Sequence, residues 1–480
     1  MPVTLDRPIS WKNASGDDAR MLDQLQPNIL KGHTRDIFTA IFVKFHDRGQ
    51  AASLLAELST DGIVPALMKS ANTHLNEIQA FKQMKTPGTS YVGVGLTVNG
   101  YDKLEIPKQL QPDDAAFQRG MTNNQTRALL DDPDVDTWDG HFGQLIDAVI
   151  LVGDATAVSH SIALERVRQM IAARPLVLLM EEQSGKGQHN GAHEGIEHFG
   201  YVDGRSQPLF FEEDIADEPS VATWDPGFGP GRAIVPDPAA PDPTTQFGSY
   251  FVFRKLEQNV QLFKKEEGNL ATQLELAPTD RGRAGAMIVG RFEDGRPLTM
   301  APIGSSPVVN DFNYSADPDG GRCPLFGHIR KMNPRGSGGF ESHESERLHI
   351  MARRGQTYGE RTDDINDDDL NGKPTAGVGL LFMAFNADLV DQFEFVQRNW
   401  ANNENFPRHN SPNAPGLDQV IGHGTRTKSD CPLTWDAKLA TAGAFGVANP
   451  IAQAVTMKGG DYFFMPSLAF LRDPVGFEAA

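Results

Sequence analysis

The chain has 480 residues, of which 39% are hydrophobic and 22% charged, and these proportions are typical of a folded globular protein. Its 63 acidic residues outnumber 44 basic ones, which gives a formal net charge of −19 at pH 7. This balance, without any basic run, argues against a nucleic-acid-binding protein and favours neutral or cationic partners. The length allows one large domain or two to three smaller ones.

Cysteine usage and hydropathy restrict the class of protein further. The chain has two cysteines, Cys323 and Cys431, and neither belongs to a CxxC pair. We therefore expect no disulfide framework, structural zinc or iron–sulfur cluster, and a reducing compartment. The first residues contain no apolar stretch typical of a secretory signal, and apolar runs such as 175–180 are too short to span a bilayer. We expect a cytoplasmic protein without membrane spans.

The first half of the chain alternates predicted strands and helices. Its strands are rich in β-branched and aromatic residues, and its second helix has apolar positions at helical spacing. Strands are expected at 37–45, 90–98 and 147–152, and helices at 50–58 and 157–172. This irregular alternation indicates an α+β fold.

The second half repeats the strand–helix pattern after a segment without periodicity. Residues 224–243 are rich in Pro, Gly and Asp, which predicts an interdomain connection or a long surface loop. Strands are then expected at 248–253 and 377–385, with helices at 256–265 and 389–400. In the last helix Leu389, Phe393, Val396 and Trp400 share one apolar face, which predicts core packing. We expect a duplicated α+β domain, with an N-terminal domain at 1–223, a connection at 224–247 and a C-terminal domain at 248–480.

His328 is the strongest candidate for a metal ligand. It follows Pro-Leu-Phe-Gly, small and apolar neighbours that would let a flat cofactor approach closely. A haem iron held by one imidazole keeps its opposite face open for a small ligand. Such an imidazole normally donates its other N–H to a carboxylate. Asp388 is the first candidate for this partner, with Asp391 and Glu394 as alternatives. A surface or hydrogen-bonded core histidine is the competing interpretation.

Asp203 and Arg353 could supply the acid–base and charge-stabilising groups on the open side of such an iron. Asp203 lies within Gly200-Tyr-Val-Asp-Gly204, and Arg353 opens Arg353-Arg354-Gly355. A carboxylate there would take a proton from bound hydrogen peroxide and return it to the leaving oxygen. A guanidinium would stabilise the charge that builds up as the O–O bond breaks. Taken singly, Asp-Gly is a turn signal and an arginine pair could form surface ion pairs.

In this order and at these separations, the three motifs resemble those of the dye-decolourising peroxidase family. The resemblance extends from 26–33 to 459–467 and includes 311–314 and 379–388. It implies two ferredoxin-like α+β domains with antiparallel sheets and peripheral helices, and haem b in the C-terminal domain. His328 would be proximal, with Asp203 and Arg353 distal. Gly355 departs from the family pattern, since some relatives carry an asparagine there.

Four further residues have two open interpretations each. Leu380 and Phe382 share one strand face, so they could form apolar walls of a haem pocket or simply pack in the core. Trp400 and Tyr358 could relay electrons to a buried haem or pack in the interior.

His189, His193 and His198 have spacing compatible with a metal, but their loop composition favours solvated side chains.

The resemblance implies a haem-dependent peroxidase. It would reduce hydrogen peroxide and oxidise dyes, phenols or other organic donors in one-electron steps through a ferryl intermediate. Two alternatives remain open: a haem carrier or storage protein, which would need His328 but neither Asp203 nor Arg353, and an enzyme that acts on the porphyrin itself. Neither the oligomeric state nor the physiological reductant follows from the residues.

Overall fold

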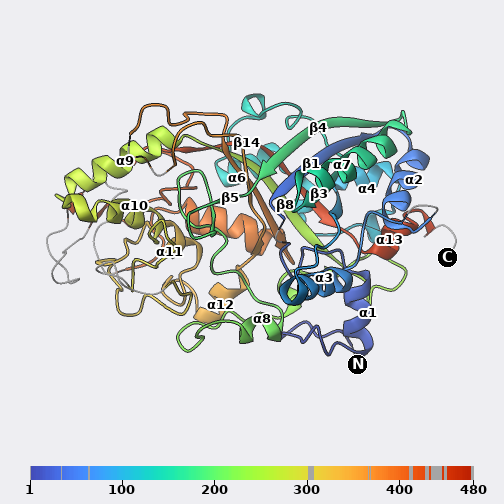
Figure 1. Cartoon of the computed structure of the whole chain (residues 1–480), viewed down its shortest axis with the longest axis horizontal. Coiled ribbons are helices and arrows are strands. Elements are labelled where there is room, and N and C mark those ends of the chain that lie inside the picture. The colour runs from blue at the N-terminus through green and yellow to red at the C-terminus, as the bar shows by residue number, and fades with distance from the viewer. Residues whose placement is uncertain are drawn as a thin grey trace.

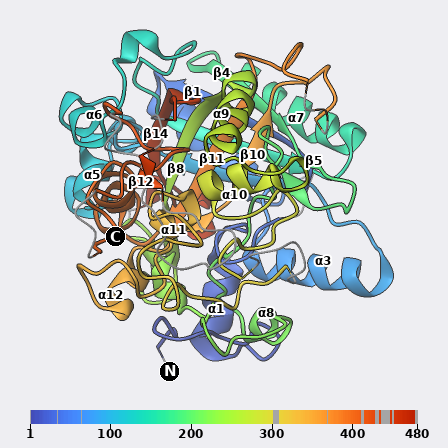
Figure 2. The same ribbon diagram turned by 90° about the vertical axis from the view of Figure 1, so that its left-hand side faces the viewer.

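The structure is a computed structural model, shown in two orientations in Figures 1 and 2. It describes residues 2–33, 35–62, 65–300, 308–365, 367, 369–409, 414–426, 432–433, 446–447 and 451–476. Cys431 lies outside these residues, whereas Cys323 is a buried free thiol.

The N-terminal half contains one antiparallel sheet with helices packed on it. Its strands and main helices, in chain order, are β1 (Ile37–Phe45), α2 (Arg48–Ser59), β2 (Tyr91–Leu96), β3 (Ala148–Asp154), α7 (Ala157–Ala172) and β4 (Val177–Lys186). The strand order is β2-β3-β1-β4. This order, with a helix after the first and third strands, is that of a ferredoxin-like unit. All five elements expected here are confirmed.

Shorter elements surround this sheet. The helices are α1 (Gly16–Gln24), α3 (Ala71–Met84), α4 (Val98–Lys103), α5 (Ala115–Arg119), α6 (Asn124–Leu130) and α8 (Glu212–Ala216). Two short strands, β5 (Gln188–His189) and β6 (Gly195–Ile196), pair with each other, and Ile196 also forms a bridge with Val202. Several helices begin at a side-chain cap; for example, the Asp47 carboxylate accepts from the Gln50 amide at the start of α2.

The C-terminal half repeats the same topology. Its strands are β8 (Phe247–Gln258), β9 (Ala352–Arg353), β10 (Gln356–Tyr358), β11 (Gly379–Asn386) and β14 (Val455–Met465). Its helices are α9 (Val260–Gln273), α10 (Gly282–Val289), α11 (His328–Met332), α12 (His343–Leu348) and α13 (Leu468–Arg472). Two further strands, β12 (Pro432–Leu433) and β13 (Gly446–Val447), pair with each other. The order β14-β8-β11-β10 again places the fourth strand beside the first and the first beside the third.

Two expected helices differ from the structure. The helix expected at 256–265 begins only at Val260, because residues 254–258 extend β8 and pair with both β11 and β14. The helix expected at 389–400 is present but consists of two π-helical stretches, Leu389–Glu394 and Val396–Ala401. Apolar spacing does not reveal this widening, and π-helical turns are found mostly at functional sites. The four residues predicted to form its apolar face are all buried.

The two halves form one continuous sheet whose ends approach each other. β14 pairs with β2 at Phe464 and Leu96. At the opposite edges, Thr357 Oγ1 in β10 donates to the Lys186 carbonyl in β4. The sheet therefore curves round towards a barrel. In Figure 1, α2, α4 and α7 lie at one end and α9 and α10 at the other; Figure 2 shows α9, α10 and α11 in front of the sheet.

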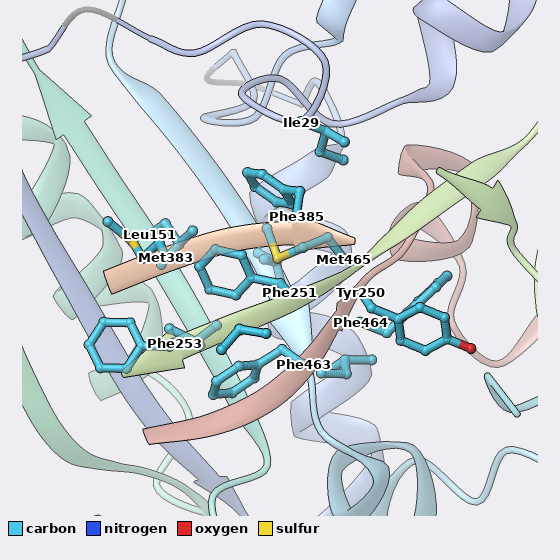
Figure 3. Packing of buried hydrophobic residues seen from close by; sticks show 14 of the residues in the cluster. Ile29, Leu151, Tyr250, Phe251, Phe253, Met383, Phe385, Phe463, Phe464 and Met465 are labelled. Carbon is cyan, nitrogen blue, oxygen red and sulfur yellow. The ribbon is translucent and has the colours of Figure 1, made fainter. Parts of the chain in front are cut away.

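Aromatic side chains from both halves fill the space enclosed by this sheet. Figure 3 shows Phe251, Phe253, Phe385 and Phe463 from the C-terminal strands in this core. Phe42 of β1 contacts Phe253 and Phe463, with ring centroids 4.9 and 6.2 Å apart respectively. Burial of these rings therefore holds the two halves together.

The segment expected to connect the two halves is largely irregular. The segment 224–247 has little regular structure, with one 3-10 turn at Pro230–Arg232 and strand β7 (Val235–Pro236) beside β8. Trp224, Phe228 and Ile234 are nevertheless buried, so much of this segment packs against the rest of the protein.

No helix in the described parts of the chain combines the length and apolarity needed to cross a bilayer.

The contact of Phe42 with the C-terminal strands yields a stability prediction. Phe42→Ala removes a fully buried ring and leaves a cavity between the halves. We expect it to lower the free energy of unfolding by about 3–5 kcal/mol in chemical denaturation. Phe81, which is 48% exposed, is the matched control, and Phe81→Ala should change stability by no more than about 0.5 kcal/mol. Equal effects of both substitutions would contradict this view of the core.

Candidate active site

His328 is the first residue of the short helix α11, and buried polar contacts fix its position. The Asp317 carboxylate accepts from the Cys323 amide at 2.8 Å and forms an ion pair with Arg330 at 3.0 Å. The Arg330 guanidinium also lies over the Tyr314 ring, 4.7 Å from its centroid. The Asp317 carboxylate therefore links the residues just before His328 to Arg330, which belongs to the same helix as His328.

The carboxylate partner of His328 is Asp418. His328 Nδ1 lies 2.8 Å from Asp418 Oδ2, and the other Asp418 oxygen accepts from the amides of Val420 and Ile421 at 2.8 and 2.9 Å. Asp418 is fully buried. Burial raises its pKa, but the charge and hydrogen bond of His328, together with these amides, outweigh burial and hold the pKa below its ordinary value.

This pairing determines which nitrogen of His328 is free. An ionised carboxylate only accepts hydrogen bonds, so Nδ1 carries a proton, and in the neutral imidazole the lone pair is then on Nε2. Nε2 has no hydrogen-bond partner among the residues that the structure describes, and the side chain is 21% exposed. The imidazole is thus oriented by a buried anion on one side and available as a ligand on the other.

The prediction that Asp388 is the partner of His328 is wrong. The Asp388 carboxylate accepts from the Asp391 amide at 2.7 Å and caps the π-helical segment. Of the alternatives, Glu394 pairs with Arg119 at 2.6 Å, and the backbone carbonyl of Asp391 accepts from His349. No local signal in the sequence points to Asp418, because it lies 90 residues from His328 in a segment without periodicity.

Asp203 is presented on an exposed turn. Gly200 and Gly204, which bracket it, have φ values of +98° and +74°, a region that favours glycine. The Asp203 amide donates to the Gly195 carbonyl at 3.0 Å and fixes the turn. Its carboxylate is exposed and forms no hydrogen bond or ion pair with any described residue.

Arg353 lies against the same turn. It belongs to β9, where its amide donates to Gln207 Oε1 at 3.0 Å and its Nη2 donates to the Arg205 carbonyl at 2.7 Å. Within the described chain, Arg353 is not in ion-pair contact with Asp203. The structure thus brings together two motifs that are far apart in the sequence, through the loop 203–207.

The exit from α11 reaches this loop as well. Arg335 Nη2 donates to Ser206 Oγ at 2.9 Å, and Arg291 Nη2 donates to the same oxygen at 3.0 Å. The Arg335 guanidinium is stacked between the rings of Trp224 and Phe312, 4.2 and 3.8 Å from their centroids. Segments carrying His328, Asp203 and Arg353 therefore all meet at residues 203–207.

This cluster of cations is buried, which the sequence did not reveal. Arg291 and Arg335 are 3% and 6% exposed. Burial lowers the pKa of Arg291 to about 10, with Arg205 and Arg353 adding repulsion, and lowers the pKa of Arg335 to about 9. Arg335, one of the basic residues after His328, donates to the backbone carbonyls of Asn310 and Phe312 inside the protein.

Leu380 and Phe382 of β11 point to the same side of the sheet as Arg353 of the neighbouring strand β9. Residues directly opposite in an antiparallel pair point to the same side, and Arg353 stands opposite Ala384. Leu380 and Phe382 have the same parity as Ala384 and are half-buried, whereas the core residues Met383 and Phe385 point to the other side. A Cβ at Gly355 would lie 3.4 Å from Leu380. Their role as pocket walls stays a prediction.

Three other candidates lie in the interior. Trp400 and Tyr358 are 1% and 7% exposed, and the Trp400 ring is stacked on Phe406 with centroids 5.4 Å apart. This agrees with the packing interpretation of both residues. His198 was expected to be a solvated loop residue, which is wrong: it is fully buried and its Nε2 lies 2.7 Å from the Tyr358 carbonyl.

The ligand chemistry of the site fits a macrocyclic cofactor. No group of three or more His, Cys, Asp or Glu side chains in the described chain is arranged to hold a metal ion. An iron bound to His328 Nε2 would therefore need most of its ligands from elsewhere, and a porphyrin supplies four nitrogens. The free imidazole nitrogen and the buried carboxylate behind it match that requirement.

Comparisons with known proteins agree with this chemistry. A family model described as the DyP dimeric alpha+beta barrel domain matches residues 24–179. The multifunctional dye peroxidase DyP2 of Amycolatopsis sp. is 53% identical over 98% of this chain and all of its own length. Its solved structure superposes with a TM-score of 0.92 and covers 98% of this chain and 100% of that one, at 52% identity. A DyP-type peroxidase of Anabaena sp. gives a TM-score of 0.86 at 32% identity and covers 97% of each chain.

The depressed pKa of Asp418 yields a pH-dependent prediction. We expect Asp418→Asn to lower the free energy of unfolding of the cofactor-free protein by about 2–3 kcal/mol at pH 7. A carboxylate whose pKa is depressed by folding stabilises the protein above its ordinary pKa, and this contribution is lost as the pH falls through the folded value. The difference between the proteins should therefore narrow below pH about 4. Chemical denaturation at several pH values measures it.

Asp388→Asn is the matched control for this experiment, because asparagine caps a helix as well as aspartate does. It should leave stability nearly unchanged over the same pH range. A difference between Asp418→Asn and the parent protein that grows towards low pH would contradict the assignment.

Proposed function

The chain belongs to the dye-decolourising peroxidase family and is a haem-dependent peroxidase, and we propose that it binds haem b with His328 as the proximal ligand and Asp203 and Arg353 as the distal groups. The observation that carries this proposal is the hydrogen bond of 2.8 Å between His328 Nδ1 and the buried Asp418 carboxylate. This bond makes the imidazole a stronger electron donor at Nε2. When bound, haem supplies an iron that coordinates peroxide and takes up its oxidising equivalents.

Asp203 has the properties of the proton-transfer group. Its carboxylate is exposed, has no partner among the described residues and stands on a turn fixed by a backbone hydrogen bond. It takes a proton from the peroxide oxygen that binds iron and transfers it to the other oxygen, which leaves as water. Transfer between atoms of one substrate molecule returns the carboxylate to its starting state.

Arg353 stabilises the departing oxygen. Its Nη2 is anchored on the Arg205 carbonyl at 2.7 Å, which aligns the guanidinium while its other N–H groups stay available. A permanently charged group held in place needs little reorganisation as negative charge develops. Leu380 and Phe382, on the same strand face, exclude water from the reacting atoms.

The proposal also includes the domain organisation, the electron donors and the cellular location. The units 1–223 and 248–480, joined by 224–247, each contain one ferredoxin-like strand order, and the proposed haem ligand lies in the second. Hydrogen peroxide and organic electron donors are the substrates. The cytoplasmic location expected from composition belongs to the proposal as well.

A haem carrier would need His328 but would not need the loop 203–207 to meet Arg353. The contacts of Arg353 with Arg205 and Gln207 therefore favour the peroxidase over the carrier. The alternative that the enzyme modifies the porphyrin has no specific observation in its favour.

We expect His328→Ala to abolish haem binding, because the iron would lose its protein ligand. The measurement is the Soret absorbance per protein after reconstitution with haem, which should fall to the level of unspecific binding. His343→Ala is the control, since His343 is exposed and should leave binding unchanged. A full Soret band in the His328 variant would exclude His328 as the ligand.

Arg353→Leu should retain haem but react with peroxide about 10²–10³-fold more slowly, since it removes one charge-stabilising group. Stopped-flow absorbance of the haem-loaded protein mixed with peroxide gives the rate constant. The neighbouring Arg354 provides a control: its guanidinium donates to the carbonyls of Asn28 and Ile29 and points away from the loop 203–207. Arg354→Leu should lower stability but leave the rate per haem-loaded molecule similar. Equal rates in both variants would contradict the role of Arg353.

A further inference from the structure

Lys331 is buried beside the proposed haem ligand, and the Asp418 carboxylate acts on its charge although the two groups are not in ion-pair contact. It lies three positions after His328 in α11 and is 0% exposed. Its Nζ donates to the carbonyls of Gly416 at 2.7 Å, Asn403 at 2.8 Å and Phe406. Among the described residues it forms no ion pair with a carboxylate. Three acceptors use all three N–H bonds of an ammonium group.

Burying an ammonium group in this way is unfavourable, so packing alone does not explain the residue. An apolar side chain of similar length would fill the same space without desolvating a charge. The ammonium provides a fixed attachment, because one group on α11 binds the carbonyls of Asn403, Phe406 and Gly416.

One of these three carbonyls belongs to a residue close to Asp418 in the chain. Gly416 stands two positions before Asp418, and its own amide donates to the Glu404 carbonyl at 2.8 Å. The other hydrogen bonds of the Asp418 carboxylate come from the amides of Val420 and Ile421. These two residues are sequence neighbours of Asp418 and do not belong to α11. Lys331 therefore links the helix that carries His328 to the loop that carries Asp418.

We propose that Lys331 is a positioning residue that fixes the Asp418 carboxylate against His328 Nδ1 and so sets the electron donation of the imidazole. This inference rests on the proposed function, since it concerns His328 as an iron ligand. Residues three apart in a helix lie on one side, so the anchoring point and the imidazole face the same loop. Loss of the anchor lengthens or misaligns the His328–Asp418 hydrogen bond without touching either partner.

The reduction potential of the haem-loaded protein tests this proposal, because positioning and simple charge predict opposite signs. A stronger imidazole donor stabilises the ferric state and makes the potential more negative. If Lys331 positions Asp418, Lys331→Met should make the potential more positive, as Asp418→Asn does. If Lys331 acts only as a nearby positive charge, its loss should make the potential more negative. If it only packs, the potential should not change.

The double variant sharpens the test. With Asp418 already replaced, adding Lys331→Met should produce no further positive shift, since the two residues act through one hydrogen bond. Lys12→Met, which removes an exposed lysine, is the charge control and should leave the potential unchanged. A negative shift or no shift for Lys331→Met, or a double variant with additive positive shifts, overturns the proposal.

Two provisions keep the test decisive. If Lys331→Met does not fold, Lys331→Gln keeps a polar donor of lower capacity, and a positive shift there supports the proposal while no shift or a negative one overturns it. If Asp418→Asn leaves the potential unchanged, the hydrogen bond does not set the electron donation of the imidazole and the role of Lys331 fails with it, whereas the assignment of His328 as iron ligand fails only if His328→Ala keeps a full Soret band. A shift in Asp418→Asn without one in Lys331→Met refutes only the role of Lys331.

Discussion

The hydrogen bond between His328 and Asp418 is the interaction on which the site depends. It joins a fully buried carboxylate to a partly exposed imidazole at 2.8 Å. A buried anion is stable only when its hydrogen-bonding capacity is met, and two backbone amides and one imidazole meet that of Asp418. The consequence is a histidine with a fixed tautomer, a fixed orientation and one free nitrogen. A peroxidase needs all three properties in its proximal ligand.

Buried cations organise the surroundings of this pair. Arg330 pairs with Asp317, and Arg335 lies between two aromatic rings and donates to Ser206 of the loop that carries Asp203. Arg353 donates to the same loop. Guanidinium groups suit this role because their planar donors bind several carbonyls at once. The segment of α11 and the residues that follow it thus connect His328 with the loop that carries Asp203, although these motifs are far apart in the chain.

Both halves have the same topology, and the two faces of the shared sheet have different surroundings. Both halves have the strand order of a ferredoxin-like unit, and they share one sheet whose enclosed face is filled by aromatic residues. On the opposite face of β11 the side chains of Leu380 and Phe382 are only half-buried, and Arg353 stands beside them. Because side chains alternate along a strand, β11 places one set of residues in the core and leaves the other set beside Arg353.

The sequence by itself determined the fold class and most strands, because hydrophobic periodicity is a local signal, and its short motifs singled out His328, Asp203 and Arg353 as candidates. It did not determine the partner of His328: Asp388 begins a helix and was a reasonable candidate, whereas Asp418 occupies an irregular loop that only folding brings to the imidazole. Burial of Arg335, Lys331 and His198, and the π-helical turns after Asp388, were likewise decided by tertiary structure. Charge and spacing in a sequence do not show which carbonyls a side chain will meet once distant segments pack together.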